Sequence, residues 1–517
     1  MRWPEPWRAL RSAPHAPLSD GCDDGATVKA VSQKRLSSVP EKLRQIISNW
    51  GPVEWTLVAA GIVLRVVASL AYWPTIPSNA DSWPYAYYAG HDIFGDPQHP
   101  AGYSLFLAIV GLFTRNVAAF TVLQHLLGIA TALAMFAAVR RLSGSPWPGV
   151  VAAAFVLLNA DQVYQENQIV SEWLFTLLWA LGLYATARTI DARTARWRWA
   201  IAAGVLTGLA VVVRTQGALL IPVFALGVLL SRPRPWRAHW RSPVALLLSG
   251  CVVLLGYGTA KALDTGEFQI GPSPGWQLYA HVAPFADCAL FTPPRGTAKL
   301  CETIPPSERE GDGHYLYDPS SPAVALWGKI GNHDNLAMSW ALAVIEAQPG
   351  EYLRSVWGIM RDYYVPGTFK YVPGAGDDID SELSWKGVVP PTAAATVKGM
   401  ESFFDPFHPT AHPRRQQALY DYQRVFRLGA TLLTICSLLT VLALCVGPRR
   451  TRVCALVLGC GAVLTLVPQA AGGAYVGRYS VPLSGSMGAS AAVAIMVLYR
   501  MERQRRAHLS SESGAHA

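Results

Sequence analysis

Several ionisable residues lie inside or near the long apolar segments of this 517-residue sequence, and four of them are candidates for chemistry. In chain order they are Asp81, Glu172, Arg214 and Arg478. A charged group at membrane depth costs free energy, so such residues are functional candidates unless a partner or solvent accounts for them. A carboxylate can accept a proton from an attacking hydroxyl, and an arginine binds phosphate oxygens through a rigid fork of donors. The residue types therefore suit general-base chemistry beside an anion site.

Each of the four residues also has a structural explanation that the sequence leaves open. Asp81 could be a solvated loop residue, and Glu172 could favour a helix N-terminus. Arg214 could form a structural ion pair, and Arg478 could contact lipid headgroups. The aromatic residues that follow Asp81 suit stacking on sugar rings, but aromatics also mark the membrane–water interface. They are Trp83, Tyr85, Tyr87, Tyr88 and Phe94.

The composition indicates a membrane protein. Hydrophobic residues make up 51% and charged residues 15%, whereas a soluble chain has about 25% charged residues. There are 43 Lys and Arg against 34 Asp and Glu, a net charge of +9. Because the basic residues lie between apolar segments, we assign this charge to membrane topology and not to nucleic-acid binding. Ten segments are predicted to span the membrane: 55–73, 118–139, 147–160, 168–187, 199–213, 216–230, 242–262, 428–446, 453–470 and 480–499.

One more apolar segment, 101–114, is too short to span. Fourteen helical residues reach about 21 Å, against a hydrocarbon core of about 30 Å, so we expect an interfacial or re-entrant helix. Ten spans then place both chain termini in the cytoplasm. The predicted cytoplasmic loops and tail are rich in arginine, as the positive-inside rule requires. Examples are Arg140, Arg141, Arg193, Arg234, Arg450 and Arg503.

The sequence therefore predicts an all-α polytopic protein of the cell membrane with about ten transmembrane helices and an inserted, mixed extracytoplasmic region. Residues 199–230 are expected to break at Arg214–Gly217, at or below the outer membrane surface. Cys288 and Cys301 lie in the inserted region, where the oxidising environment favours a disulfide, with two free thiols as the alternative. The predicted parts are a disordered cytoplasmic tail (1–53), a transmembrane core (54–262) with a first outer loop (75–117), an extracytoplasmic domain (263–426), C-terminal transmembrane helices (427–500) and a cytoplasmic tail (501–517).

These residues and their order resemble the GT-C superfamily of polytopic glycosyltransferases. The similar branch contains the protein O-mannosyltransferases, the lipid A aminoarabinose transferases and the RgtA/B/C/D-like enzymes. The resemblance extends over about 55–230 and, weakly, the last span. It rests on Asp81-Ser82 with Tyr85 and Tyr88, His99-Pro100, Leu123–Leu127, Ser171–Phe175, Gly208–Ala210 with Arg214, and Gly477-Arg478-Tyr479 with Pro482.

The resemblance implies a hexosyl- or pentosyltransferase with a sugar donor linked to polyprenyl phosphate. It implies inverting transfer to a hydroxyl of a cell-envelope glycan, lipid or protein acceptor outside the cytoplasm. It implies that Asp81 is the catalytic carboxylate of the first outer loop. His99 matches a Lys or His that precedes a proline in these enzymes. Arg214 stands near a Lys–Gly pair of the family, with the charge kept but the spacing changed. The implied substrate-binding residues are His99, Glu172, Arg214, Arg478 and Tyr479.

Two other functions remain open at this stage. A transporter or flippase of lipid-linked sugars would use the arginines without chemistry at Asp81, although such proteins often contain repeated spans and none is evident. A non-enzymatic receptor or assembly factor would bind through 263–426. Some members of the resembled family bind a divalent metal through paired acids, so a metal is possible here, and Asp92 is too generic to assign as a ligand.

Overall fold

The computed structural model describes residues 51–77, 79–192, 196–232, 240–366, 383–385 and 393–515. The chain forms two units, Met1–Trp55 and Thr56–Ala517. The predicted cytoplasmic tail 1–53 lies almost wholly outside the described residues. Everything that follows concerns the second unit, with α3 (Pro52–Ala71) at its start.

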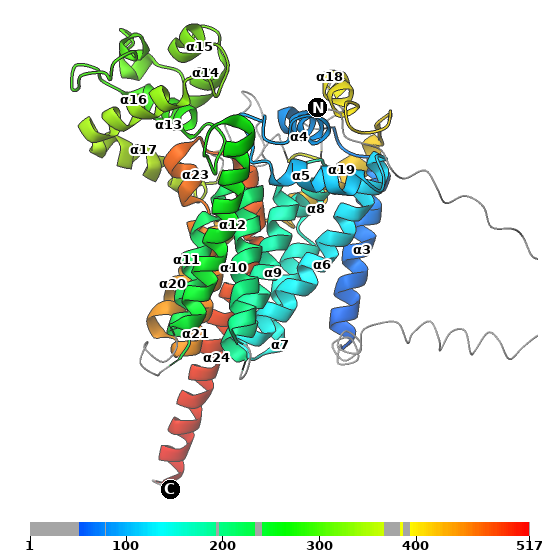
Figure 1. Ribbon diagram of the computed structural model, residues 1–517. Helices are drawn as coiled ribbons and strands as arrows, with labels where there is room; N and C mark the ends of the chain where they lie inside the picture. Colours follow the sequence, from blue (N-terminus) through cyan, green and yellow to red (C-terminus); the bar gives the residue numbers. More distant parts are fainter. Residues whose placement is uncertain are drawn as a thin grey trace, which may run out of the picture. The chain divides into compact units, whose positions relative to one another are not determined.

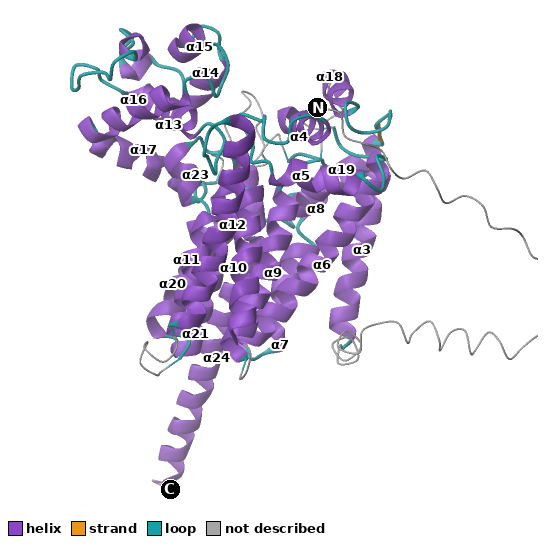
Figure 2. Cartoon of the chain, viewed as in Figure 1, coloured by secondary structure: helices purple, strands orange, loops and turns teal. Residues whose placement is uncertain are grey.

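The described part of the chain is mostly helical, with two strands of two residues each, which confirms the predicted all-α class (Figure 2). Within it, seven segments are long and apolar enough to cross a membrane. They are α3, α6 (Val117–Ser143), α9 (Glu172–Asp191), α10 (Arg196–Val213), α12 (Arg241–Thr265), the segment Arg449–Gly472 and the segment Gly477–His508. Shorter apolar helices occupy three more predicted spans: α7 (Pro146–Leu157), α11 (Leu220–Leu230) and α20 (Ala430–Val446).

The two last long segments are built from several helices. The segment Arg449–Gly472 contains α21 (Arg449–Ala455), a π-helical turn η7 (Leu456–Cys460), α22 (Gly461–Leu464) and α23 (Val467–Gly472). The segment Gly477–His508 begins with the 3₁₀-helix η8 (Gly477–Leu483) and continues as α24 (Ser484–Ala515). Figure 1 shows α24 leaving the bundle at the end opposite α4 and α5.

Local sequence explains where α6 begins and ends. The Asn116 side chain accepts hydrogen bonds from the backbone N–H groups of Ala118 and Ala119, which caps the first turn. Gly144 ends the helix in the left-handed region, at φ 73°, which glycine adopts without steric cost. The 27 residues between these caps form the central helix against which α7 and α9 pack.

Three short helices, α4, α5 and α8, lie near one end of the bundle, which we call the site end (Figure 1). α4 (Asn79–Gly90) follows α3, and α5 (Gly102–Gly111) packs against it. With ten residues, α5 is about 15 Å long, too short to cross a membrane. α7 ends at Leu157, three residues before the end of the predicted span 147–160, and a separate short helix, α8 (Ala160–Glu166), lies before the next predicted span.

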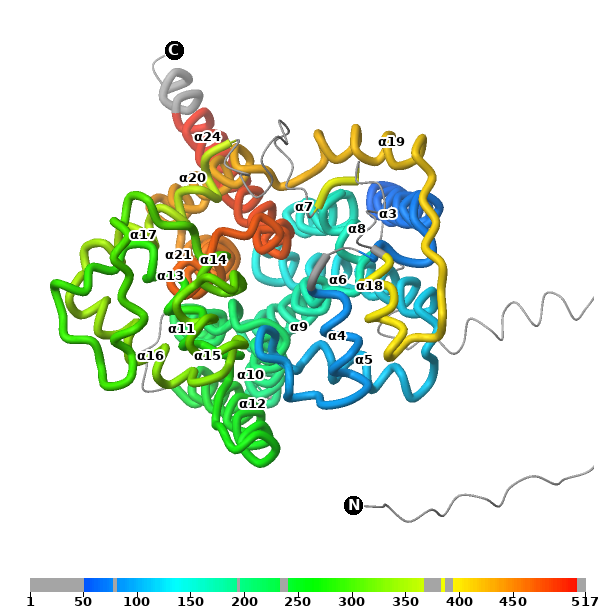
Figure 3. The backbone as a smooth tube through the Cα atoms, turned by 90° about the horizontal axis from the view of Figure 1, so that it is seen from above, coloured from blue at the N-terminus to red at the C-terminus, as the bar shows by residue number. Residues whose placement is uncertain are grey.

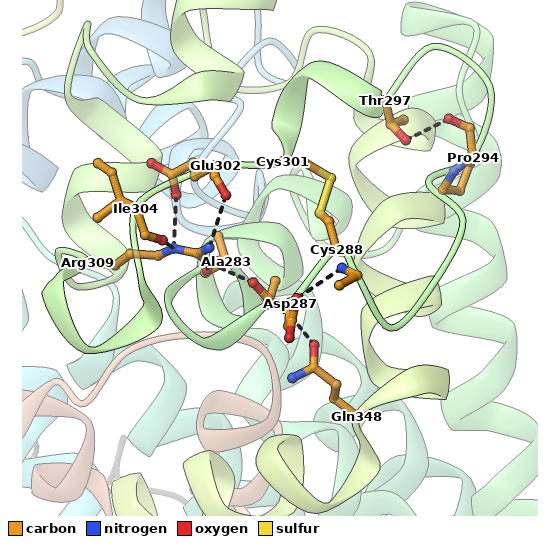
Figure 4. Close-up of a disulfide and its surroundings, with 12 residues drawn as sticks. Ala283, Asp287, Cys288, Pro294, Thr297, Cys301, Glu302, Ile304, Arg309 and Gln348 are labelled. Atoms are coloured by element: carbon orange, nitrogen blue, oxygen red, sulfur yellow. Dashed lines mark hydrogen bonds and ion pairs between the residues drawn. A yellow bond between two sulfur atoms is a disulfide. The ribbon is translucent and has the colours of Figure 1, made fainter.

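The first part of the inserted region has its own small core. Its helices are α13 (Pro274–Val282), α14 (Asp312–Tyr317), α15 (Pro322–Trp327), α16 (Asp334–Ala347) and α17 (Pro349–Asp362). The core contains the fully buried aromatic rings of Trp276, Tyr279 and Trp340. A disulfide joins Cys288 to Cys301 beside it, and Arg309 donates to the carbonyls of Ala283 and Ala286 (Figure 4).

The second part of the inserted region covers the site end. α18 (Ala393–Met400) packs against α4, and α19 (Pro413–Gln423) packs against α8. Between them, β2 (Thr410–Ala411) pairs antiparallel with β1 (Tyr72–Trp73), directly after α3. Figure 3, viewed from above, shows α18 and α19 around α3 and α4, while α13 to α17 lie over a different set of helices. The region therefore divides into two parts with different neighbours.

Candidate active site

Asp81 lies in the first turn of α4 and contacts two cationic groups from distant parts of the chain. One carboxylate oxygen, Oδ1, is 3.3 Å from Nε2 of His99, and the other accepts a hydrogen bond from Nη2 of Arg478. The side chain is 15% exposed, so ligand and solvent can reach it. Burial alone would raise the pKa of Asp81, but the Arg478 and His99 charges hold that pKa well below its usual range.

His99 is fixed between two carboxylates. Its Nδ1 is 2.9 Å from Oδ2 of Asp96, whose other oxygen accepts the backbone N–H groups of Gln98 and His99. Burial favours the neutral ring, but the Asp96 and Asp81 charges outweigh this effect and raise the pKa of His99 to about 10. The imidazole is therefore protonated at neutral pH, with one N–H directed at each acid.

Glu172 joins two arginines at the first turn of α9. Its Oε1 is 3.0 Å from Nη1 of Arg214 and 3.2 Å from Nε of Arg478. Arg214 is placed here because α10 ends at Val213 and the 3₁₀-helix η2 (Thr215–Leu219) restarts the chain, so the predicted break occurs at the expected position. The ring of Tyr479 lies 4.3 Å from the Arg214 guanidinium carbon, a cation–π contact.

An aromatic wall lines this group of charges. Tyr85, one turn after Asp81 on α4, has its ring 4.6 Å from that of His99 and 4.8 Å from that of Tyr103. The hydroxyl of Tyr85 is 2.9 Å from Oγ of Ser171, which also accepts a hydrogen bond from Nη1 of Arg214. The wall thus connects α4 to the break after α10 through hydroxyl groups.

We call this group the Asp81 cluster. It comprises Asp81, Asp96, His99, Glu172, Arg214 and Arg478. Its three carboxylates balance its two guanidinium groups only when His99 is protonated, in agreement with the raised pKa of His99. A buried cluster with balanced charge avoids the large desolvation penalty of an unpaired ion.

The structure brings together all six site residues predicted in the membrane part of the sequence. Asp81, His99, Glu172, Arg214, Arg478 and Tyr479 all lie within this one group of contacts. Arg478 is only 8% exposed, so its contacts are acids rather than open lipid. Arg214 does form the ion pair proposed as its structural explanation.

Sequence reasoning missed three residues of this site: Asp96, Ser171 and Tyr85. The spacing of Asp96, three residues before His99, was an available signal for an acid that orients a histidine. The sequence indicated Tyr85 and Ser171 only as parts of the motifs that carry the family resemblance, without a role in the site. Their roles depend on the fold, because their partners lie on other helices.

The residues of the Asp81 cluster do not fit a divalent metal. Both oxygens of Asp81 already face cations, and a metal would compete with Arg478 and protonated His99 for them. Among the described residues, no group of three or more His, Cys, Asp or Glu side chains has the geometry to hold a metal ion. We therefore derive no step through a metal.

A second ionic group lies nearby in the bundle. Arg65 of α3 binds Glu166 of α8 through two hydrogen bonds of 2.8 Å, and Nδ1 of His125 is 3.2 Å from the same carboxylate. We call Arg65, Glu166 and His125 the Glu166 cluster. α6 has room for it because it carries Gly128, where a Cβ would overlap the Glu166 carboxylate.

Comparison with known proteins agrees with this architecture. Residues 98–257 match the sequence profile of the family described as dolichyl-phosphate-mannose-protein mannosyltransferase. The resemblance to GT-C glycosyltransferases is confirmed. The matched segment includes His99, Glu172 and Arg214, whereas Asp81 and Arg478 lie outside it. No curated protein sequence matches the chain.

Solved structures give a weaker likeness. The crystal structure of the Archaeoglobus fulgidus oligosaccharyltransferase tethered with an acceptor peptide aligns with a TM-score of 0.40 and 11% identity, covering 88% of this chain and 51% of that one. The oligosaccharyltransferase AglB of the same organism, in complex with an inhibitory peptide and a dolichol-phosphate, aligns with a TM-score of 0.37 and 13% identity, covering 89% and 52%. The chain spans about half the length of these structures.

Proposed function

We propose that the protein is a membrane glycosyltransferase that moves a sugar from a polyprenyl-phosphate-linked donor to an acceptor hydroxyl on the extracytoplasmic face. The observation that carries the proposal is the position of Asp81, a part-exposed carboxylate between His99 and Arg478, with Arg214 held nearby through Glu172. One site thus contains a proton acceptor and two phosphate-binding cations. Its aromatic wall is suited to contact with a sugar ring.

The reaction is a single displacement. The acceptor oxygen attacks the anomeric carbon while the bond from that carbon to the phosphate oxygen breaks. The acceptor proton passes to Asp81, and polyprenyl phosphate leaves with the bonding electron pair. The product therefore has inverted anomeric configuration. Arg214, Arg478 and protonated His99 stabilise the charge that grows on the leaving phosphate.

The ion pair between Asp81 and Arg478 suggests an order of events. While it persists, Arg478 holds the pKa of Asp81 low, which makes Asp81 a weak base. A donor phosphate that binds Arg478 competes with Asp81 for the guanidinium. Asp81 then loses a cationic partner, its pKa rises, and it becomes a better proton acceptor when the donor is in place.

Transfer by reconstituted protein tests the proposal. Proteoliposomes are incubated with radiolabelled polyprenyl-phosphate sugars and membrane extracts as the source of acceptors, and the anomeric configuration of the product is determined by NMR. Transfer with inversion is expected. Movement of the labelled donor across the bilayer without transfer would instead identify a flippase.

The predicted face is tested separately. Reporters fused within 270–366 should be accessible from outside intact cells, and a reporter at Arg450 should be cytoplasmic. A cytoplasmic reading within 270–366 would contradict the proposed face, because α13 and α17 pack against α23, and α23 contacts η2, the 3₁₀-helix that follows Arg214.

A further inference from the structure

α3 leaves a lateral groove between itself and α6. The groove has a volume of about 640 Å³. Figures 1 and 3 both show α3 at the edge of the bundle beside α6. The walls of the groove are aliphatic side chains from the two helices: Ile62, Val66 and Leu70 from α3, with Val122, Leu126 and Ile129 from α6.

The groove lies between two helices, α3 and α6, that are both long and apolar enough to cross a membrane. α3 has the length and composition of a membrane span, yet only 17% of its apolar window is buried inside the protein. The side chains along both walls are half-exposed, for example Val66 at 52% and Leu126 at 59%. A span that leaves this much surface open contacts lipid chains, and a groove between two such surfaces accepts a hydrocarbon chain.

The polar groups of the groove lie at two places. Arg65 and His125 line its inner side, where both are already engaged with Glu166. At the site end the groove is bordered by His412 and Arg415. Both residues are exposed, and one Arg415 nitrogen donates a 2.8 Å hydrogen bond to the Leu70 carbonyl.

This end of the groove is positively charged. Arg415 carries a full charge, and α19 begins at Pro413, which adds the positive end of a helix dipole. An apolar channel at membrane depth with a cation at its end complements a lipid that has a long chain and an anionic headgroup. A neutral or zwitterionic headgroup would not use the Arg415 charge as well.

We propose that this groove binds an anionic phospholipid of the bilayer, with one acyl chain between α3 and α6 and the phosphate group at Arg415 and His412. The site is separate from the Asp81 cluster, whose arginines come from the residue before η2 and from η8 rather than from α19. The lipid would fill the space that α3 leaves beside the bundle. The proposal does not depend on glycosyltransferase activity.

Native mass spectrometry of the full-length protein tests the site, with phosphatidylglycerol and phosphatidylcholine as probes. We expect the protein to retain phosphatidylglycerol about 10-fold more strongly, and Arg415→Ala to remove most of this preference, because it removes the charged donor that the lipid phosphate would contact. Arg415→Lys should keep part of it. The matched control is Arg414→Ala, which removes a neighbouring exposed arginine that does not line the groove.

A second pair of variants tests the apolar walls. Leu126→Trp should fill the groove and reduce retention of both lipids. Ile435→Trp, on the exposed face of α20, should leave retention unchanged. Melting temperatures in lipid-free detergent show which variants are folded. The comparison of Leu126→Trp with Ile435→Trp still tests the groove if Arg415→Ala does not fold.

Three results would overturn the proposal. Equal retention of the two lipids would remove the charge argument. An equal loss in Arg414→Ala would show a diffuse surface effect. Displacement of bound phosphatidylglycerol by polyprenyl phosphate, with the same sensitivity to Leu126→Trp, would show that the groove holds the donor chain instead.

Discussion

The Asp81 cluster and the Glu166 cluster differ in how completely their charges are paired. In the Glu166 cluster, a planar arginine fork meets both carboxylate oxygens, and the two side chains are 3% and 0% exposed. In the Asp81 cluster, each acid shares its partners with another acid, and Asp81, His99 and Arg478 are 10–15% exposed. A closed pair has no capacity for a ligand. A shared, part-open set can exchange partners, and this is what a site for an anionic substrate requires.

The largest expected effect is the loss of sugar transfer when the Asp81 cluster, the part-open one, is changed. Asp81→Asn keeps the shape of the side chain but removes the proton acceptor, so transfer should fall by about 10²–10⁴ while donor binding survives. Initial transfer rates and donor binding in proteoliposomes measure both quantities. Asp92→Asn, an exposed acid in the same loop, is the control and should transfer normally. Near-normal transfer by Asp81→Asn would show that the open cluster is not catalytic.

Substitutions in the Glu166 cluster, the closed one, should lower stability and leave transfer intact. Arg65→Ala leaves Glu166 buried without its main partner, which should lower the free energy of unfolding by about 3–5 kcal/mol. Transfer per folded molecule should stay close to that of the unmodified protein. Thermal melts and active-site counts separate the two effects. Lost transfer at an unchanged melting temperature would mean that both clusters serve the reaction.

Arg214 tests whether the open cluster binds phosphate. Arg214→Ala should lower donor affinity and turnover together, each by about 10-fold, since the guanidinium contact strengthens as the leaving group gains charge. Arg214→Lys should recover part of both, because the charge remains while the fork is lost. Donor titration and single-turnover rates give the two values. A lower melting temperature with unchanged donor affinity would favour the structural ion pair with Glu172.

The smallest expected effect is a dependence of stability on pH. The pKa of His99 is raised in the folded protein, so protonated His99 contributes stability that is fully present below its unfolded pKa of about 6.5 and is lost as the pH rises towards about 10. The difference in melting temperature between the unmodified protein and His99→Gln should therefore shrink from pH 6.5 to pH 10. A constant difference would mean that His99 is neutral throughout.

Hydropathy was sufficient to predict the helical class, because apolar blocks and arginine-rich loops follow from the cost of placing charge in lipid. The break at Arg214 was predicted for the same reason. Hydropathy separated the spans 147–160 and 168–187, but it did not predict the helix α8 between them, since Asn159 and Asp161 are polar but their neighbours are apolar. A short buried helix produces no periodic signal of its own.

The residues of the site were predictable by type, but their pairing was not. Charges at the edges of apolar segments identified Asp81, Glu172, Arg214 and Arg478. Asp81 and Arg478 are separated by 397 positions, and only the folded bundle brings them together. In the same way, Arg65 lies within an apolar segment, but its partner could not be assigned before α8 was known.

Helix α8 connects the two clusters through consecutive residues. Glu166 belongs to the Glu166 cluster, and Gln165 donates a 3.2 Å hydrogen bond to the Arg478 carbonyl. Consecutive side chains on an α-helix point about 100° apart, so these two contacts together fix the rotation of α8 about its own axis. Removing one residue from α8 would turn both side chains away from their partners at once. The rotation of this seven-residue helix is therefore fixed by these two contacts, although its sequence has no hydrophobic repeat that would set it.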